Sequence, residues 1–319
     1  MIKIHNLSKT FKSPVSTRSI LNDLFHRQYK EKTAVDSISF EIGENELVGF
    51  IGPNGAGKTT TMKMLAGILY PTEGSISVLN FTPFEKKPEY LQKIGFIMGQ
   101  RNQLIWELPP MDTFALNKII YKMGETEYKK SLRELVTLLD AEDFVNQPVK
   151  TLSLGQRMRA ELIAALLHRP KILFLDEPTI GLDIFAQSTI TEFIKDYQHK
   201  YKATIMLTSH YMQDVQRLAK RVIMIDKGKI VYNGNLTSLT KEFADKKVIT
   251  ITVSKKIENL RTLLKGYATQ YTHPQLKVEV PQKKIAEVMS ILEGLDYIDI
   301  TIENEPLEET VKRVFESRE

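Results

Sequence analysis

The chain has 319 residues, of which 42% are hydrophobic and 26% charged, which is enough apolar material for one large domain and one small one. Lys and Arg total 44 against 39 Asp and Glu, and this net charge of +5 does not by itself indicate nucleic acid or a membrane surface as a partner. Cysteine is absent, which excludes disulfides and thiolate metal sites and agrees with a reducing cytoplasm.

The sequence also lacks the features of a membrane-spanning or secreted chain. No apolar run approaches the roughly 20 residues that a membrane span requires. The N-terminus, Met1–His5, has no apolar core of a signal peptide. We therefore expect a soluble protein, so that any membrane path would have to be supplied by other chains.

The first elements in chain order are strands around a Gly-rich segment. Met1–Leu7 alternates polar and apolar residues like an edge strand, and Ser37–Ile42 predicts another strand. Glu46–Ile51 is almost continuously apolar, as is typical of a buried parallel strand. A helix is predicted over Thr59–Leu69, ended by the turn residues that begin at Tyr70.

An unusual segment, Lys12–Lys32, separates the first strand from the second. Its apolar residues at helical spacing could line one face of a helix over Ser19–Tyr29. These residues are Ile20, Leu21, Leu24, Phe25 and Tyr29. Basic residues flank the stripe, namely Arg18, His26, Arg27, Lys30 and Lys32.

The middle of the chain predicts helices and then an alternating strand–helix–strand unit. Asp112–Tyr121 and Glu127–Leu139 carry apolar residues three and four positions apart, as helices do. Lys171–Asp176 and Thr204–Ser209 are buried strands, with the helix Ile184–Lys200 between them. This order predicts an α/β fold with a mainly parallel sheet.

The last part of the chain changes character after a closing hairpin over Val222–Asp226 and Ile230–Tyr232. We expect domains over residues 1–235 and 236–319, the second a small α+β domain. Its predicted strands and helices are Val248–Val253, Glu258–Leu264, Leu276–Val280, Lys283–Leu292, Tyr297–Ile302 and Leu307–Phe315. The sequence leaves open whether this domain serves dimer contact or regulation.

The small domain carries no catalytic constellation. Its acidic cluster favours a solvated helix start over a metal site. The cluster comprises Glu303, Glu305, Glu308 and Glu309.

The Gly-rich segment is a full match to the phosphate loop G-x-x-x-x-G-K-[ST]. It comprises Gly52, Pro53, Asn54, Gly55, Ala56, Gly57, Lys58 and Thr59, with Thr60 next. Glycines let backbone N–H groups converge on phosphates at a helix N-terminus that favours anions. Lys58 would lie between the β- and γ-phosphates, and the Thr59 hydroxyl can ligate Mg²⁺. The motif therefore predicts ATP and Mg²⁺ as ligands.

Two adjacent acids follow a buried strand farther along. Asp176 ends the apolar run, so its carboxylate would lie at the carboxyl edge of the sheet, where it can hold Mg²⁺ through water. Glu177 points elsewhere and could polarise the attacking water. Adjacent acids can also be solvated turn residues, but Pro178-Thr179 downstream and the phosphate loop upstream favour the catalytic interpretation.

A third motif lies between these two and carries a family resemblance. Leu152, Ser153, Leu154, Gly155 and Gln156 precede Asp176-Glu177 by some twenty residues. The three motifs in this order resemble the ATP-binding subunit of ABC transporters over roughly residues 1–235. The resemblance implies a P-loop NTPase with a helical subdomain at about 101–165 and an antiparallel N-terminal β subdomain.

The resemblance also assigns roles to isolated residues. His210 matches the switch histidine that contacts the γ-phosphate, and Gln100 matches the glutamine that senses Mg²⁺ and the attacking water. Phe11 aligns with the aromatic residue that stacks on adenine, although core packing is the other interpretation. A loop that crosses the dimer interface would comprise Gly181, Leu182 and Asp183, preceded by Ile180.

The peptide Leu152–Gln156 implies a second copy of the chain. Ser153 and Gly155 resemble the residues that open a helix facing the γ-phosphate on another subunit, where the helix dipole stabilises the charge. Two copies would then enclose two ATP molecules head to tail. Leu154 stands where glycine is commoner.

Several details resemble one branch, the ATPases of bacterial exporters with separately encoded permeases, usually two different ones. They are the residues at 152–159, those at 177–183, the early insertion Lys12–Lys32, and Gly99-Gln100-Arg101 followed by Trp106. This implies a place on the inner face of the cell membrane and no nucleic-acid partner. Trp106 could line a permease groove or pack in the core. The predicted helix at Ser19–Tyr29 could dock on membrane or permease, or pack on its own domain.

Two alternative functions remain. An importer ATPase would also have separate permeases, and the neighbouring reading frames distinguish it from an exporter. A soluble ABC ATPase acting on ribosomes or DNA is disfavoured because the chain has a single cassette. Only 95 residues separate Lys58 from Ser153, too few for long coiled-coil arms.

Overall fold

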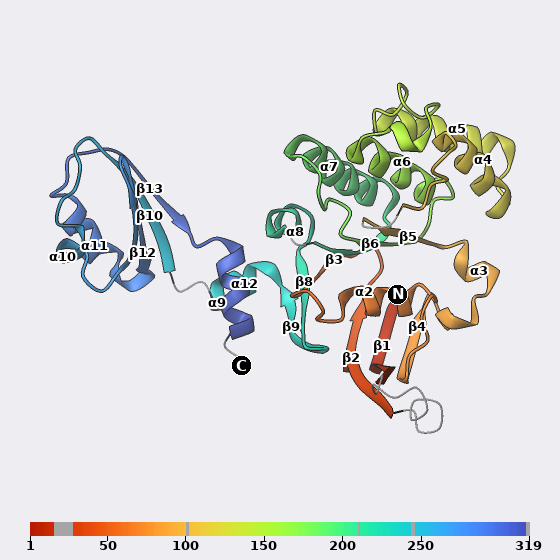
Figure 1. Cartoon of the computed structure of the whole chain (residues 1–319), viewed down its shortest axis with the longest axis horizontal. Helices are drawn as coiled ribbons and strands as arrows, with labels where there is room; N and C mark the ends of the chain where they lie inside the picture. The colour runs from red at the N-terminus through yellow and green to blue at the C-terminus, as the bar shows by residue number, and fades with distance from the viewer. Residues whose placement is uncertain (16–27, 100–101, 210, 244–245, 317–319) are drawn as a thin grey trace. The chain divides into compact units, whose positions relative to one another are not determined.

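The computed structural model describes residues 1–15, 28–99, 102–209, 211–243 and 246–316. These residues form two compact units, Met1–Gly234 and Asn235–Glu319, which we describe separately (Figure 1). Among the described residues, no helix is both long and apolar enough to cross a membrane.

The first unit is built on a six-stranded sheet in the order β5-β6-β7-β3-β8-β9. The strands are β3 (Leu47–Ile51), β5 (Ile94–Met98), β6 (Ile172–Asp176), β7 (Thr204–Thr208), β8 (Arg221–Asp226) and β9 (Lys229–Asn235). Strands β5, β6, β7, β3 and β8 pair in parallel. All residues of β3, β6 and β7 are buried, because helices cover both faces of such a sheet.

A second, three-stranded sheet has the order β2-β1-β4 and is antiparallel. Its strands are β1 (Ile2–Val15), β2 (Gln28–Ile42) and β4 (Glu73–Val78). One cluster of buried side chains joins both sheets to helix α2 (Lys58–Leu65), with members that include Ile2, Phe40, Phe50 and Met62. This cluster fixes the phosphate loop against the N-terminal sheet.

The structure corrects the prediction for the segment Lys12–Lys32. Strand β1 continues to Val15 and β2 begins at Gln28, so the segment extends a long hairpin in which Tyr29 pairs with Pro14. The predicted helix is therefore wrong at Gln28 and Tyr29, and its remainder lies outside the described residues. Cross-strand pairing to β1 determines the conformation here, whereas five apolar residues at helical spacing do not.

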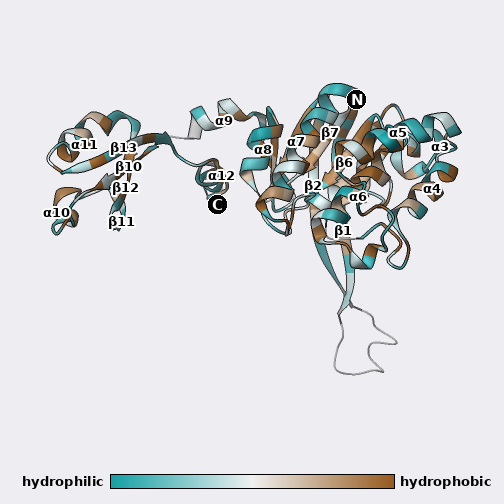
Figure 2. Ribbon diagram, turned by 90° about the horizontal axis from the view of Figure 1, so that it is seen from above, coloured by the Kyte–Doolittle hydropathy of each residue, from teal (hydrophilic) through white to brown (hydrophobic). Residues whose placement is uncertain are grey.

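Several helices of the first unit lie together on one side of the six-stranded sheet (Figure 1). They are α4 (Pro110–Ile120), α5 (Glu125–Leu138) and α6 (Leu154–Leu166), with α7 (Ile184–Tyr201) beside them. In Figure 2 the core strands β6 and β7 carry hydrophobic colour, whereas the helices around them mix both kinds of residue. Short elements complete the unit: η1 (Pro83–Glu85), α3 (Pro88–Leu91), η2 (Val149–Thr151) and α8 (Met212–Leu218).

Helix α2 is shorter than the sequence predicts. It ends at Leu65 rather than Leu69, because Gly67 has a φ of +74°. A Cβ at this glycine would lie 2.3 Å from the carbonyl oxygen of Pro83. Glycine is therefore required here, and the chain leaves the helix a turn early.

The second unit is an antiparallel sheet in the order β11-β12-β10-β13. Its elements are α9 (Leu236–Phe243), β10 (Lys246–Val253), α10 (Leu260–Leu263), β11 (Ala268–Thr272), β12 (Gln275–Pro281), η3 (Gln282–Lys284), α11 (Ile285–Leu292), β13 (Tyr297–Asn304) and α12 (Leu307–Glu316). The sheet buries one side in a core that includes Ile249, Val278 and Val288. Helix α9 and strand β11 were absent from the sequence prediction.

One acidic residue of this unit differs from its prediction. Glu305 is only 8% exposed, and its carboxylate forms an ion pair with Arg313 on α12. The expectation that the whole acidic cluster is solvated is therefore wrong at this position. The described residues contain no group of three or more His, Asp or Glu side chains arranged to hold a metal ion.

Candidate functional site

The phosphate loop connects the buried strand β3 to helix α2. Gly57 caps α2 with a φ of +111°, and a Cβ there would lie 2.5 Å from the carbonyl oxygen of Ala34. A Cβ on Gly52 would lie 2.1 Å from the carbonyl oxygen of Ile225. Other backbone atoms approach these two positions so closely that only glycine fits there. The amides of the loop can then converge on a phosphate at the N-terminus of α2.

Lys58 is the buried cation of the loop. Its side chain is 5% exposed, and Nζ donates to the carbonyl oxygens of Gly52 at 2.7 Å and Pro53 at 3.1 Å. Burial lowers the pKa of this amine, while the charges of Glu177 and Asp176 oppose that shift. The positive charge is held where an anion would compensate its burial.

The two acids after β6 are fixed by Thr208 at the end of β7. The Thr208 hydroxyl donates to Asp176 Oδ1 at 2.7 Å. The same threonine accepts the backbone N–H of Glu177 through both its carbonyl and its hydroxyl oxygen. Glu177 has a φ of +56°, which turns its side chain away from that of Asp176. One acid is thus held at the sheet edge, and the other faces the loop.

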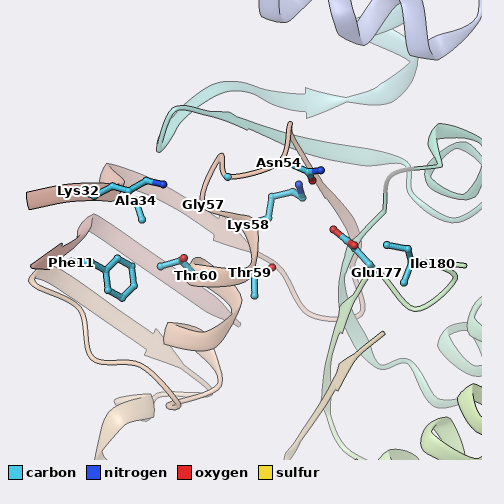
Figure 3. Close-up of a pocket in the computed structure, with 11 residues that line it drawn as sticks. Phe11, Lys32, Ala34, Asn54, Gly57, Lys58, Thr59, Thr60, Glu177 and Ile180 are labelled. Carbon is cyan, nitrogen blue, oxygen red and sulfur yellow. The ribbon is translucent and has the colours of Figure 1, made fainter. Parts of the chain in front are cut away.

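Lys58 and Glu177 belong to one cavity of about 670 Å³. Its lining residues are Phe11, Lys32, Ala34, Asn54, Gly55, Gly57, Lys58, Thr59, Thr60, Glu177 and Ile180. In Figure 3 Phe11 and Lys32 lie on one side, and Glu177 and Ile180 face the loop from the other. The volume lies in the range of small-ligand sites.

The hairpin of β1 and β2 supplies the outer wall of this cavity. Phe11 and Lys32 are direct cross-strand partners, and the Phe11 ring is 39% exposed. Lys9 Nζ lies 5.3 Å from the ring centroid. An exposed aromatic ring beside the phosphate loop can stack on a flat heterocycle, so Phe11 is not a core residue.

The peptide Leu152–Gln156 begins helix α6 with a complete capping box. Gln156 N donates to Ser153 Oγ at 3.2 Å, and Ser153 N donates to Gln156 Oε1 at 2.9 Å. These bonds fix the first turn of α6 and leave the N–H groups of Leu154 and Gly155 pointing along the helix axis. None of the described residues that line the nucleotide cavity comes from this peptide.

The loop Gly181–Asp183 touches this helix start. Asp183 caps α7 by accepting from Ala186 N at 2.9 Å. A Cβ on Gly181 would lie 3.2 Å from Leu154 Cδ2, and one on Gly155 would lie 3.1 Å from Ala186 Cβ. Leu154 therefore packs toward the loop, and this contact accounts for a large residue at its position.

The segment after Gln100 is bonded to the residues that precede α6. Val149 N donates to the Leu108 carbonyl at 3.0 Å, and Lys150 N donates to the Trp106 carbonyl at 3.1 Å. Trp106 is 47% exposed, so it is not a core residue. Gln100 and His210 lie outside the described residues.

Sequence reasoning missed three residues around the site. Thr208 was treated as the end of a strand, although it holds both acids. Asp214 on α8 is buried and accepts from Thr179 at 2.7 Å, which ties the segment after Glu177 to α8. Glu161 on α6 is 2% exposed and accepts from Gln103 N at 3.4 Å. An acid within the apolar stripe of α6 was the available signal for Glu161.

Burial raises the pKa of Glu161 to about 7. Its second carboxylate oxygen has no hydrogen-bond partner among the described residues. A carboxyl group in such a place favours its neutral form, because an ionised one would lack compensation. Glu161 on α6 therefore has a pKa near neutral pH where this helix contacts Gln103 of the segment after β5.

Comparisons with known proteins agree with this arrangement. Residues 35–180 match the ABC transporter family. The ABC transporter ATP-binding protein NatA of Bacillus subtilis (strain 168) is 34% identical over 236 residues, which cover 74% of this chain and 96% of that protein. The linearmycin resistance ATP-binding protein LnrL of the same strain is 32% identical over 228 residues, covering 72% and 73%.

A solved structure shows the same fold. It is a dimeric post-hydrolysis state of the ATP-binding cassette MJ0796 bound to ADP and Pi, with a TM-score of 0.63 and 24% identity. The match covers 74% of this chain and 98% of that one. The predicted fold is confirmed, and the extent of identity to NatA settles the family. The chain belongs to the ATP-binding subunits of ABC transporters, and it binds and hydrolyses ATP to energise a transporter.

Proposed function

We propose that two copies of the chain close head to tail around two ATP molecules and drive export through a pair of separately encoded permeases. The observation that supports this proposal is that the phosphate loop and the peptide Leu152–Gln156, which are both expected to contact ATP, do not line the same cavity. The nucleotide cavity holds the phosphate loop and Glu177 but no residue of Leu152–Gln156. The capped start of α6 is an anion-binding end, which a second copy would place over the γ-phosphate.

The proposed order of events follows from the groups in the cavity. Lys58 and the loop amides bind the phosphates, and Phe11 stacks on the adenine ring. Glu177 accepts the proton of the attacking water, because its carboxylate faces the loop (Figure 3). The start of α6 from the partner copy stabilises the charge that develops on the γ-phosphate. Hydrolysis then removes the anion that held the copies together.

Mg²⁺ fits the oxygen donors of this cavity. The Thr59 hydroxyl and the Asp176 carboxylate are hard donors beside the phosphate loop. Asp176 is held through one carboxylate oxygen by Thr208, which leaves the other for the ion or its water. Together with Gln100, these residues would hold the ion, whose chemistry is to neutralise phosphate charge.

The segment Ile105–Leu108 is the proposed permease contact. Ile105, Trp106 and Leu108 are 42%, 47% and 41% exposed, whereas Leu104 is buried at 5%. Exposed apolar side chains in such density mark interaction surfaces. The carbonyl oxygens of Leu108 and Trp106 accept hydrogen bonds from Val149 and Lys150, just before α6 begins. These bonds would transmit a movement of the permease to the start of α6. This arrangement would place the subunit on the cytoplasmic face of the membrane.

Export is favoured over import by the relatives. The LnrL protein, 32% identical, is named for linearmycin resistance, and this name supports export. An importer remains the competing function. Two adjacent permease genes would support the exporter, and a gene for a secreted binding protein would support the importer.

The permease contact can be tested by charge insertion. The chain is co-expressed with candidate permeases from adjacent genes, and complexes are isolated from membranes by a tag on one permease. Ile105→Asp should remove the chain from the complex. Ile302→Asp, at 45% exposure in the second unit, is the matched control and should leave the complex intact. Equal recovery of both variants would contradict the proposed contact.

The direction of transport has a separate test. Cells expressing the complete transporter with Glu177→Gln are compared with cells expressing the parent for accumulation of labelled amphiphilic antibiotics. An exporter predicts higher accumulation of its substrate in the variant cells. Lower accumulation in the variant cells would identify an importer instead.

A further inference from the structure

A second concave site lies at the amino ends of the core strands, whereas the nucleotide cavity lies at their carboxyl ends. Strands β6, β7 and β3 run in parallel, and the phosphate loop follows the carboxyl end of β3. Arg169 precedes the amino end of β6, and Tyr201 precedes the amino end of β7. Both residues line a pocket of about 900 Å³ together with the outer face of α5. Five-residue strands of about 17 Å separate the two sites.

This basic pocket carries a strong excess of positive charge. Its ionisable lining residues are Lys129, Lys130, Arg133, Glu134, Arg169 and Lys200. Five cations thus surround one carboxylate in a single concave surface, although the whole chain has a net charge of only +5. A cluster of this kind attracts multiply charged anions.

The floor of the basic pocket is organised by its one acid. Glu134 accepts from Arg169 at 3.1 Å and also forms bonds with Lys200 and Tyr201. The carboxylate is thereby engaged and holds two cations in place. Burial acts to raise the pKa of Glu134, but the hydrogen bonds from Lys200 and Tyr201 and the nearby positive charges keep it below its ordinary value. These bonds hold the side chains of the floor together, and the two cations with one carboxylate leave a net positive charge there.

The rim cations remain available to a ligand. Lys130 and Arg133 have no ion pair among the described residues, and both are exposed on α5. Lys129 pairs with Glu125 at 3.1 Å, which lies outside the pocket. The Arg169 Nε, which is buried, also lacks a hydrogen-bond partner in the described part of the chain. Several donors of the basic pocket are therefore free to bond to an anionic ligand.

An adjoining cavity of about 230 Å³ extends the site along α7 and shares Leu138, Lys200 and Tyr201 with it. Tyr197 lines this cavity and is 3% exposed. Its hydroxyl has no hydrogen-bond partner among the described residues, which is rare for a buried polar group. The adjoining cavity also contains the carboxylates of Glu192 and Asp196, so the phosphate groups would lie in the basic pocket and the adjoining cavity would take the uncharged part of the ligand.

We propose that the basic pocket binds a phosphorylated ligand with at least two negative charges. Arg133, Arg169 and the lysines would bind phosphate oxygens, because Arg and Lys donate charge-assisted hydrogen bonds to them. Leu138 and the Tyr201 ring would contact the apolar part of the ligand. Two sources share this chemistry, a free diphosphate compound and the headgroup of an anionic phospholipid. Since α7 runs from the loop at Asp183 to this pocket, the ligand would act on the ATPase through that helix.

The test measures binding of inorganic pyrophosphate to the full chain by titration calorimetry. A Lys58→Ala background weakens binding at the phosphate loop. In that background, adding Lys130→Glu with Arg133→Glu should weaken pyrophosphate affinity at least about tenfold. The matched control, Lys256→Glu with Lys283→Glu, makes the same charge change in the second unit and should leave the affinity unchanged. The pair Lys130→Gln with Arg133→Gln replaces the Glu variants if these fail to fold.

A second arm distinguishes the source of the phosphate. Co-sedimentation is measured with phosphatidylcholine vesicles that contain or lack cardiolipin, whose headgroup carries two phosphates. Loss of vesicle binding only in the pocket variant identifies a lipid headgroup, and loss of pyrophosphate binding only in that variant identifies a free compound. If neither depends on Lys130 and Arg133, or if the control pair has an equal effect in both arms, the proposal is overturned.

Discussion

Two buried groups of opposite charge face each other across the nucleotide cavity. Lys58 and Glu177 are 5% and 8% exposed, and the charge of Glu177 opposes the lowering of the Lys58 pKa by burial. Lys58 Nζ bonds to two carbonyl oxygens of the loop, and the backbone N–H of Glu177 bonds to Thr208. Changing either one should therefore remove a single function of the cavity and leave its walls in place.

Replacing Lys58 with Ala should abolish ATP hydrolysis. The variant loses the cation between the phosphates, while the bonds from its Nζ to Gly52 and Pro53 are replaced by water. Steady-state phosphate release measures the effect, and circular dichroism checks the fold. Turnover equal to that of the parent would show that the loop is not the catalytic site.

Replacing Glu177 with Gln should preserve ATP binding and block the chemical step. The amide keeps the size of the side chain but cannot accept the proton of water. ATP should then accumulate between two copies, so that size-exclusion chromatography shows a dimer with ATP and Mg²⁺ but not with ADP. A variant that stays monomeric and hydrolyses ATP like the parent would refute both the role of Glu177 and the head-to-tail pair.

Glu161 predicts a pH dependence of stability. Its pKa is about 7 in the folded chain against an ordinary value of 4.5. Between these two values the unfolded chain ionises the group and the folded chain retains the proton, so stability falls as pH rises through this window and is then constant. The loss amounts to roughly 3 kcal/mol by pH 8.

The Glu161→Gln variant removes this titration. Its amide oxygen can still accept from Gln103 N, so the fold should persist. Urea unfolding at pH 5 and pH 8 should show a smaller difference in unfolding free energy for the variant than for the parent. An unchanged difference would mean that other groups account for the dependence. Glu279→Gln, on an exposed ion pair of the second unit, is the control.

At the scale of elements, only part of the long hairpin of β1 and β2 lines the nucleotide cavity. Its inner part places Phe11 opposite Lys32, and both line the nucleotide cavity. Farther out among the described residues, Ser13, Pro14, Tyr29 and Lys30 do not line the cavity. Substitutions can therefore test the part of the hairpin that lines the cavity separately from the part that does not.

Replacing Phe11 with Ala should weaken ATP binding by about 1–2 kcal/mol, roughly tenfold, through loss of base stacking. Tyr29→Ala on the same hairpin is the control, because Tyr29 is 55% exposed and does not line the cavity. Fluorescent-nucleotide titration measures both affinities. Equal affinities of the two variants would show that Phe11 does not stack on adenine.

At the scale of the whole molecule, the two units have separate hydrophobic cores. The cluster that joins both sheets of the first unit ends at Ile230, and the cluster of the second unit begins at Ile249. Each unit therefore holds the contacts that stabilise its own fold.

A chain ending at Gly234 should fold and bind ATP with an affinity within about twofold of the parent. The nucleotide cavity lies wholly within Met1–Gly234. Thermal denaturation followed by circular dichroism and nucleotide titration measure the outcome. Loss of cooperative unfolding in the shortened chain would show that the second unit completes the first.

The sequence by itself determined the parallel core, the phosphate loop and the paired acids. Each depends on local order: a continuous apolar run predicts a buried strand, and glycines at fixed spacing predict a loop that approaches phosphate. The family resemblance implied a helix start at Leu152–Gln156, where α6 begins with a capping box formed within four residues.

Only the tertiary structure decided the features that join residues distant in sequence. Thr208 lies 32 positions from Asp176 and holds it, Phe11 meets Lys32 across a hairpin, and the basic pocket combines α5 with the amino ends of two strands. Five apolar residues at helical spacing failed to predict Gln28 and Tyr29, because pairing to β1 overrides a local preference. Local patterns determine elements, whereas burial and pairing between elements determine which side chains meet.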